Sequence, residues 1–120
     1  MSTTGQTAID IINRSHHRRE PDAILDLMAD DAQYVQYDKN NPPSSPMSME
    51  GKAAIEEMMR DVFNRDMTHE IVAEVVTDDR IAYLVACEYP NGDRVSTSYF
   101  VDLAPDGRIT RIVAHSSWDG

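Results

Sequence analysis

A change in the spacing of apolar residues near Thr68 constrains the fold of this chain more than any other feature. Before it, apolar residues recur every three or four positions, as on one face of a helix; after it, they alternate with polar residues, as in strands. Dipeptides favoured in hairpin turns interrupt the alternating half at Asp78-Asp79, Asn91-Gly92 and Asp106-Gly107. We therefore expect an antiparallel meander of four strands, over 68–77, 80–90, 94–103 and 108–118. Helices followed by strands predict a single α+β domain over residues 1–120.

The first helix is predicted over 4–18, where Ile9, Ile12 and His16 share an apolar stripe. Adjacent His16 and His17 point in different directions, and positive charge suits the end of a helix. We interpret this pair as a solvated helix end and not as a metal site. Pro21 opens a short second helix, which is expected to end at Asp30-Asp31.

A third helix is predicted over 51–64 and has the clearest amphipathic pattern of the chain. Its apolar stripe consists of Ile55, Met58, Met59, Val62 and Phe63. A short strand over 33–38 and a proline-rich loop over 39–48 are expected before it. Loops of this length in compact domains are often lids or rims of sites.

Charged residues identify the outer face of each strand, because side chains alternate across a strand. Glu70 and Glu74 should face water. The residues of opposite parity in that strand should then face the helices: His69, Ile71, Ala73 and Val75. By the same reasoning, the inward residues of the last two strands are Thr97, Tyr99, Val101, Leu103, Ile112, Ala114, Ser116 and Trp118.

The strand over 80–90 is apolar on both faces. Ile81, Tyr83, Val85, Cys87 and Tyr89 alternate with Ala82, Leu84 and Ala86. Helices can cover only one face, and an open antiparallel sheet normally keeps the other face polar. A second copy of the chain is the simplest cover, so we expect a homodimer through the outer face around Leu84 and Ala86.

The composition excludes several classes of function. A formal net charge of −10 argues against binding to nucleic acids or anionic membranes. The single cysteine, Cys87, excludes an intrachain disulfide and argues against a cysteine-based zinc site. No apolar run approaches the ~18 residues of a membrane span, so a cytoplasmic protein is expected. The sequence has no glycine-rich phosphate loop and no metal-ligand spacing, so we predict no cofactor and no metal.

Two stretches of the sequence resemble a known superfamily. The run AILDLMADDA at 23–32, the strand and proline-rich loop after it, and GKAAI at 51–55 look like the nuclear transport factor 2-like superfamily. This superfamily includes ketosteroid isomerases, limonene-type epoxide hydrolases, scytalone-type dehydratases and SnoaL-type polyketide cyclases. The resemblance covers nearly the whole chain. It implies a cone-shaped, cystatin-like roll, in which three N-terminal helices pack on a curved antiparallel sheet around an apolar cavity, and a dimer through the sheet.

The catalytic residues of these enzymes can be compared with this chain one position at a time. Steroid isomerases use an aspartate base with a tyrosine and a protonated aspartate as donors. Ungapped alignment places these three roles on Gln36, Ile12 and Tyr99. Gln36 cannot take a proton and Ile12 cannot donate a hydrogen bond, whereas Tyr99 can donate one. Steroid isomerisation by that mechanism is therefore not expected. The limonene-type hydrolases need an Asp-Arg-Asp cluster, and the predicted inward faces hold no arginine.

The remaining polar groups define a candidate site. His69 is the preferred proton donor or acceptor, since its reference pKa lies near neutral pH; it could instead be a core histidine. Asp38 is an acidic candidate whose pKa should rise if it is buried, or a turn residue. Tyr99 could donate to an oxyanion. The residues expected to line the pocket are Ile12, Tyr34, Gln36, Met58, Met59, Phe63, Tyr83, Val85, Val101, Ser116 and Trp118.

Two functions are compatible with this site. The first is a cofactor-free enzyme that isomerises, dehydrates, cyclises or hydrolyses a small apolar carbonyl or hydroxylated molecule. The second is a non-catalytic module that binds a ligand or dimerises through its outer sheet. A cavity below roughly 100 Å³ would favour the second, because ligand sites usually exceed about 300 Å³.

Overall fold

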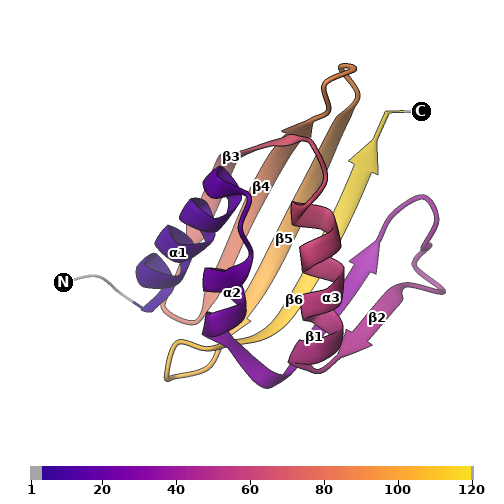
Figure 1. The fold of residues 1–120 in the computed structure, drawn as a ribbon. Coiled ribbons are helices and arrows are strands. Elements are labelled where there is room, and N and C mark those ends of the chain that lie inside the picture. Colours follow the sequence, from indigo (N-terminus) through magenta and orange to yellow (C-terminus); the bar gives the residue numbers. More distant parts are fainter. Residues whose placement is uncertain (1–3, 120) are drawn as a thin grey trace.

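The computed structural model describes residues 4–119, which form three helices and one six-stranded sheet (Figure 1). The elements in chain order are α1 (Thr4–Arg18), α2 (Asp22–Leu27), β1 (Met28–Tyr37), β2 (Met47–Glu50), α3 (Lys52–Phe63), β3 (Thr68–Val76), β4 (Arg80–Glu88), β5 (Arg94–Leu103) and β6 (Ile109–Trp118). The α+β class and the roll of helices on a curved sheet are confirmed.

The predicted meander is present as β3 to β6, and its turns lie at the predicted dipeptides. Gly92 and Gly107 adopt φ angles of 94° and 89°, a left-handed conformation that is costly for other residues. The sheet is larger than four antiparallel strands, however, because its order is β2-β1-β6-β5-β4-β3 and β1 runs parallel to β6. The end of the predicted loop over 39–48 belongs to β2, which pairs antiparallel with β1.

The second helix ends earlier than predicted, at Leu27. Met28 is fully buried and already pairs with Ile109 of β6. The pairing of β1 with β6 is irregular between Met28 and Gln33, the segment that contains Asp30 and Asp31. These two exposed aspartates therefore mark an interruption within a strand and not the end of a helix.

A β-bulge at Val72 changes which side chains of β3 face the helices. Ile71 pairs with Val85 and Ala73 pairs with Leu84, so Val72 is an extra residue. The prediction that Ala73 and Val75 point inward is wrong, because a one-residue insertion moves every later side chain to the opposite face. Val75 is 66% exposed.

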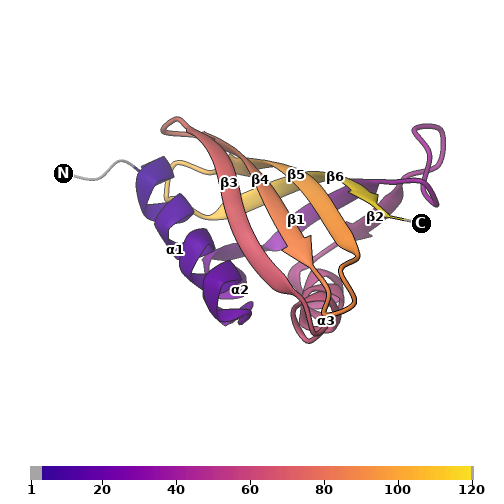
Figure 2. The same ribbon diagram turned by 90° about the horizontal axis from the view of Figure 1, so that it is seen from above.

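All three helices lie on one face of the sheet (Figure 2). Helix α1 packs on β3 and β4, whereas α3 packs on β1 and β2. The sheet curves between these two supports, so its middle strands β5 and β6 pass beneath the space between the helices (Figures 1 and 2). In the described residues, no helix combines the length and the apolar character that crossing a membrane requires.

Candidate functional site

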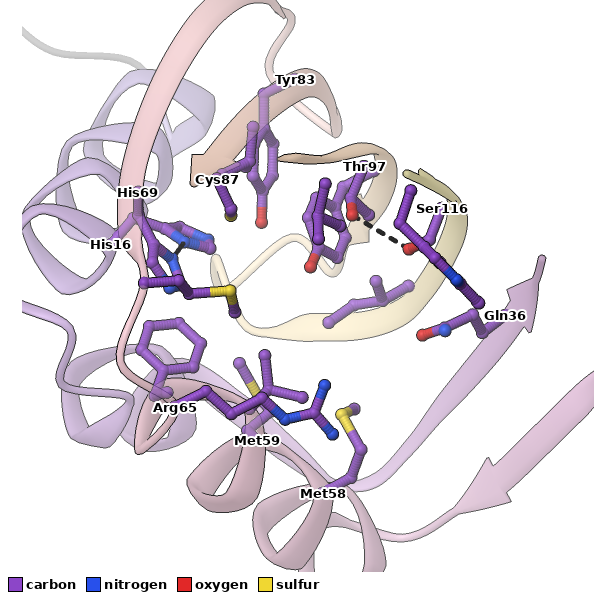
Figure 3. Close-up of a pocket in the computed structure, with 18 of the residues that line it drawn as sticks. His16, Gln36, Met58, Met59, Arg65, His69, Tyr83, Cys87, Thr97 and Ser116 are labelled. Carbon is purple, nitrogen blue, oxygen red and sulfur yellow. Dashed lines mark hydrogen bonds between the residues drawn. The ribbon is translucent and has the colours of Figure 1, made fainter. Parts of the chain in front are cut away.

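The concave face of the sheet and the helices enclose a cavity of about 310 Å³. Side chains from all three helices and from β1, β3, β4, β5 and β6 line it, and most of them are apolar. Among the residues predicted from the sequence, those at the cavity are His69, Tyr99, Tyr34, Gln36, Met58, Met59, Phe63, Tyr83, Val85, Val101, Ser116 and Trp118. Figure 3 shows how several of them surround the space.

Ile12 does not line the cavity. Its side chain is 1% exposed and belongs to the packed core between the helices and the sheet. One turn further along α1, His16 lines the cavity in its place. Among the described residues of α1, His16 is therefore the one at the cavity.

Asp38 lies outside the cavity, at the start of the connection between β1 and β2. Its carboxylate accepts hydrogen bonds from Gln36 Nε2 at 2.7 Å, from the Asn40 backbone N–H at 2.9 Å and from Asn41 Nδ2 at 2.9 Å. Slight burial raises the pKa of Asp38, but these donors outweigh it and hold the pKa below its ordinary value. The expected rise required burial in the cavity, and this condition is not met because the side chain is turned toward the loop; the structure supports the turn-residue interpretation.

His16, which is buried, and His69, which is half-buried, form a pair on the cavity wall. Their Nδ1 atoms are 2.9 Å apart, and the ring of Phe63 lies 5.0 Å from His16 and 5.2 Å from His69. His16 is 3% exposed, so its interpretation as part of a solvated helix end is wrong; only His17 is exposed. The stripe of Ile9 and Ile12 simply continues to His16, and His17 points away from it.

Burial keeps this histidine pair uncharged near neutral pH. Burial, together with a smaller effect of the neighbouring His69, lowers the pKa of His16 to about 3. The pKa of His69 is also lowered, first by burial and then by the positive charge of Arg19. An uncharged imidazole has one ring nitrogen with a free lone pair, which can accept a hydrogen bond.

Tyrosines line the wall next to the histidines. The rings of Tyr83 and Tyr99 stack with centroids 4.9 Å apart, and His16 lies 5.9 Å from the first and 6.1 Å from the second. The Tyr83 hydroxyl points into the cavity (Figure 3). Burial raises the pKa of both phenols, so they keep their protons and can donate hydrogen bonds.

A third tyrosine has a different role. The Tyr34 hydroxyl donates to Gln36 Oε1 at 2.9 Å, and Gln36 Nε2 donates to Asp38. The proton of Tyr34 is thus engaged, and its oxygen can only accept from a ligand. Burial raises the pKa of Tyr34 as well. Across the cavity, Thr97 and Ser116 share a hydrogen bond of 2.9 Å between their hydroxyls (Figure 3).

The sequence analysis missed the arginines at the cavity, Arg65 and Arg94. Arg65 follows α3, and its Nη2 donates to Asp61 at 2.8 Å. Positions 58, 62 and 65 follow the helical spacing of the Met58 stripe, so extending that stripe by one turn would have found Arg65. Arg94 is the first residue of β5, so both arginines lie at the ends of elements.

Other residues are placed as follows. Cys87 lines the cavity, and burial raises the pKa of its thiol to about 11. No residue of the loop over 39–48 lines the cavity, although Lys39 Nζ lies 5.1 Å from the ring centre of Trp118. Within residues 4–119, no three His, Cys, Asp or Glu side chains are grouped so that they could hold a metal ion.

Three helices on a curved six-stranded sheet define the nuclear transport factor 2-like fold, and comparison with solved structures supports this. A nuclear transport factor 2-like protein from Mesorhizobium loti is 15% identical, with a TM-score of 0.79 over 98% of this chain and 96% of that one. The epoxide hydrolase/cyclase-like enzyme SalBIII, which acts in pyran ring formation in the polyether salinomycin, is 21% identical, with a TM-score of 0.69 over 93% and 92%.

A third solved structure contains a ligand. It is a Mycobacterium tuberculosis protein in complex with estradiol-17β-hemisuccinate, 20% identical, with a TM-score of 0.71 over 94% of this chain and 93% of that one. At these identities the similarity establishes the fold alone. Comparison with curated proteins finds no match. Residues 9–112 match the family model of the SnoaL-like domain, and the chain belongs to this family.

Proposed function

We propose that this protein binds a small, mostly apolar molecule with a carbonyl or hydroxyl group and transfers a proton on it by means of its own side chains. The observation that carries the proposal is an uncharged histidine pair next to two protonated tyrosines on the wall of an apolar cavity. Ionisable groups with shifted pKa values in such a cavity are typical of active sites. The volume of about 310 Å³ is at the lower end for ligand sites, which favours a small ligand.

The residues have distinct roles in this proposal. The His16–His69 pair takes a proton from a carbon next to a carbonyl group of the ligand and becomes singly charged. The electron pair left behind moves to the carbonyl oxygen, to which Tyr83 and Tyr99 donate hydrogen bonds. The proton then returns to another atom of the ligand, so that no external reactant is needed for an isomerisation. Dehydration, cyclisation and hydrolysis use the same groups.

Similar proteins support this class of chemistry without defining the substrate. SalBIII is described as an epoxide hydrolase/cyclase-like enzyme, and the Mycobacterium tuberculosis protein holds a steroid derivative. Both have this fold. A steroid isomerase that uses an aspartate base is not what we propose, because Gln36 and Ile12 occupy two of its three positions and cannot replace those groups.

The first experiment is a binding screen. Trp118 is the only tryptophan of the chain and lines the cavity, so its fluorescence reports on occupancy. Steroids, terpenoids, polyketide fragments and fatty acids are screened by Trp118 fluorescence and by thermal shift, because a bound ligand raises apparent stability. A screen in which no compound changes either signal contradicts the proposal.

The second experiment tests turnover of the compounds that bind. Phenylalanine has a similar shape to histidine and no ring nitrogen, so His16→Phe and His69→Phe should each reduce kcat by about 10²–10⁴-fold. The exposed His17→Phe is the matched control and should retain full activity. Ligand binding without turnover in the unaltered protein would instead support a non-catalytic binding module.

A second proposal concerns assembly: two copies of the chain associate through the outer face of the sheet. The outward residues Val75, Ala82, Phe100, Val113 and Val35 form one continuous row across β3, β4, β5, β6 and β1. Val72, Val75 and Phe100 are 51%, 66% and 54% exposed. An apolar row of this length on a solvent-facing sheet is typical of an interface.

The charges at the two ends of this outer face favour a second copy as the partner. Arg80, Asp102 and Arg111 lie side by side at one end, with two positive charges and one negative. Glu70, Glu88 and Arg94 lie on neighbouring strands at the other end, with two negative charges and one positive. A twofold axis places the positive end of one copy against the negative end of the other, so the surface complements itself. Light scattering at micromolar concentration should give twice the mass of the chain; a monomer contradicts this proposal.

A further inference from the structure

The histidine predicted from the sequence, His69, has no ring nitrogen left to meet a ligand. Its Nδ1 lies 2.9 Å from Nδ1 of His16, so one proton is shared between them and that side of the ring is closed. Its other nitrogen, Nε2, is buried and has no hydrogen-bond partner. A molecule in the cavity therefore cannot reach either nitrogen of His69.

His16 is placed differently. It contacts His69 through Nδ1 and lines the same cavity. Within residues 4–119, the buried polar side-chain atoms without a partner are Ser15 Oγ and His69 Nε2; Nε2 of His16 is not among them. The ring centre of His16 lies 5.2 Å from that of His69, 5.9 Å from that of Tyr83 and 6.1 Å from that of Tyr99. This is where a ligand oxygen would meet both the tyrosine hydroxyls and an imidazole nitrogen.

We infer that His16, through Nε2, is the residue that contacts the ligand, and that His69 is a positioning residue that holds the His16 ring through the Nδ1–Nδ1 hydrogen bond. The contact between His16 Nε2 and a ligand does not require that the protein is an enzyme. A catalytic role for this contact, however, rests on the proposed proton transfer. The arrangement resembles other active sites in which a second group orients an imidazole. Here that second group is another imidazole, which can hold the shared proton on either ring.

The charged and titratable groups around the pair are few. Arg19 lies close enough to His69 to lower its pKa, and Cys87 is paired with His69 across β3 and β4. Tyr83 and Tyr99 face His16 from β4 and β5, and both stay protonated. Asp93 and Asp119 also line the cavity, but within residues 4–119 the hydrogen-bond partner of His16 Nδ1 is His69, so a second imidazole performs the orienting role that a carboxylate often has.

Chemical modification tests the inference without a known substrate. Diethyl pyrocarbonate acylates uncharged imidazole nitrogens that it can reach, and mass mapping identifies the modified histidine. Exposed His17 and His115 should react first, and His16 should follow through the cavity, while His69 remains unmodified. His16→Gln should abolish the slow phase. Modification of His69 before His16, or no modification of either, overturns the inference.

A pair of conservative variants tests the same roles once a substrate is found. Asparagine places a polar atom near Nδ1 of a histidine, whereas glutamine reaches the position of Nε2. His69→Asn therefore keeps the orienting partner and should retain kcat within about tenfold, whereas His16→Asn removes the contacting nitrogen and should lower kcat at least 100-fold with little change in KM. The reverse pattern, with His16→Asn active and His69→Asn inactive, would assign the ligand contact to His69 and leave the proposed function intact.

Discussion

Strand β4 is apolar on both faces, yet the surfaces around it differ in what their side chains carry. On the inner face, Tyr83, Tyr99 and Thr97 end in hydroxyl groups and border an open volume. On the outer face, the exposed Val75 and Phe100 carry no polar atom. Apolar side chains with a few converging polar groups suit a small molecule, whereas a purely apolar surface suits another protein surface. The comparison shows that apolar character alone does not distinguish a ligand site from an interface.

The outer face is tested most strongly by placing a charge at its centre. Phe100→Glu should weaken self-association by about 3 kcal/mol, or roughly 100-fold, because a buried carboxylate would lose its water without gaining a partner. Sedimentation equilibrium measures the change. Ala53→Glu adds the same charge on the exposed side of α3, away from the outer face, and should leave association unchanged. A Phe100→Glu protein with the mass of a dimer would show that the row does not form the interface.

The inner face depends on the close approach of α1 to the sheet. Gly5 lies against the end of β3, where a Cβ would collide with the carbonyl oxygen of Thr77 and crowd Val76. Gly5→Ala should therefore lower the free energy of unfolding by about 2–3 kcal/mol, although alanine is the better helix former. Urea denaturation measures this. Thr7→Ala, on the exposed side of the same helix, should be neutral or slightly stabilising; equal effects of the two changes would contradict the packing argument.

Acid should destabilise the inner face through His16. Between pH 6.5 and about 3 the unfolded chain binds a proton on this residue and the folded chain does not, so stability falls as the pH decreases through this window. The loss from His16 alone should reach about 2 kcal/mol at pH 5, and His69 adds to it in the same direction. Denaturation at a series of pH values measures the slope.

Substitutions separate this effect from the general titration of carboxylates. His16→Asn removes one titrating group and should give a shallower loss of stability between pH 6.5 and pH 5 than the unaltered protein. His17→Asn changes the neighbouring, exposed histidine and should keep the original slope. Equal slopes for the two variants would mean that His16 is protonated in the folded state at these pH values.

Hydrophobic spacing and turn dipeptides were sufficient to predict α1, α3 and the four-stranded meander, because these elements obey local rules. The remaining strands were harder to predict from the sequence. Strand β2 has four residues and follows prolines, and β1 contains Asp30 and Asp31 at an irregularity in its pairing. Its parallel pairing with β6 joins segments far apart in the sequence, which no local pattern indicates.

The candidate site was predictable where strand alternation holds and failed where it is interrupted or where a helix is involved. Alternation placed Tyr83, Tyr99 and Ser116 at the cavity, but the bulge at Val72 reversed the end of β3. His16 was on the predicted apolar stripe, and its basic neighbours concealed that it is buried. The contact between His16 and His69 is a tertiary feature that appears only when α1 lies across β3.

The smallest effect concerns the polar groups of β1, which again differ between the two faces. Tyr34 points inward and donates to Gln36, whereas Tyr37 points outward and stacks on His115 at 5.2 Å. Tyr34→Phe leaves the buried acceptor of Gln36 without its donor and should cost about 1 kcal/mol, while Tyr37→Phe should cost close to nothing. A double-mutant cycle with Gln36→Leu should return a coupling of about 0.5–1.5 kcal/mol. In the Gln36→Leu background, Tyr34→Phe removes no hydrogen bond to Gln36. If Tyr34→Phe still lowers the free energy of unfolding there, the Tyr34 hydroxyl is held by another group. Tyr34 would then no longer be restricted to accepting a hydrogen bond from a ligand.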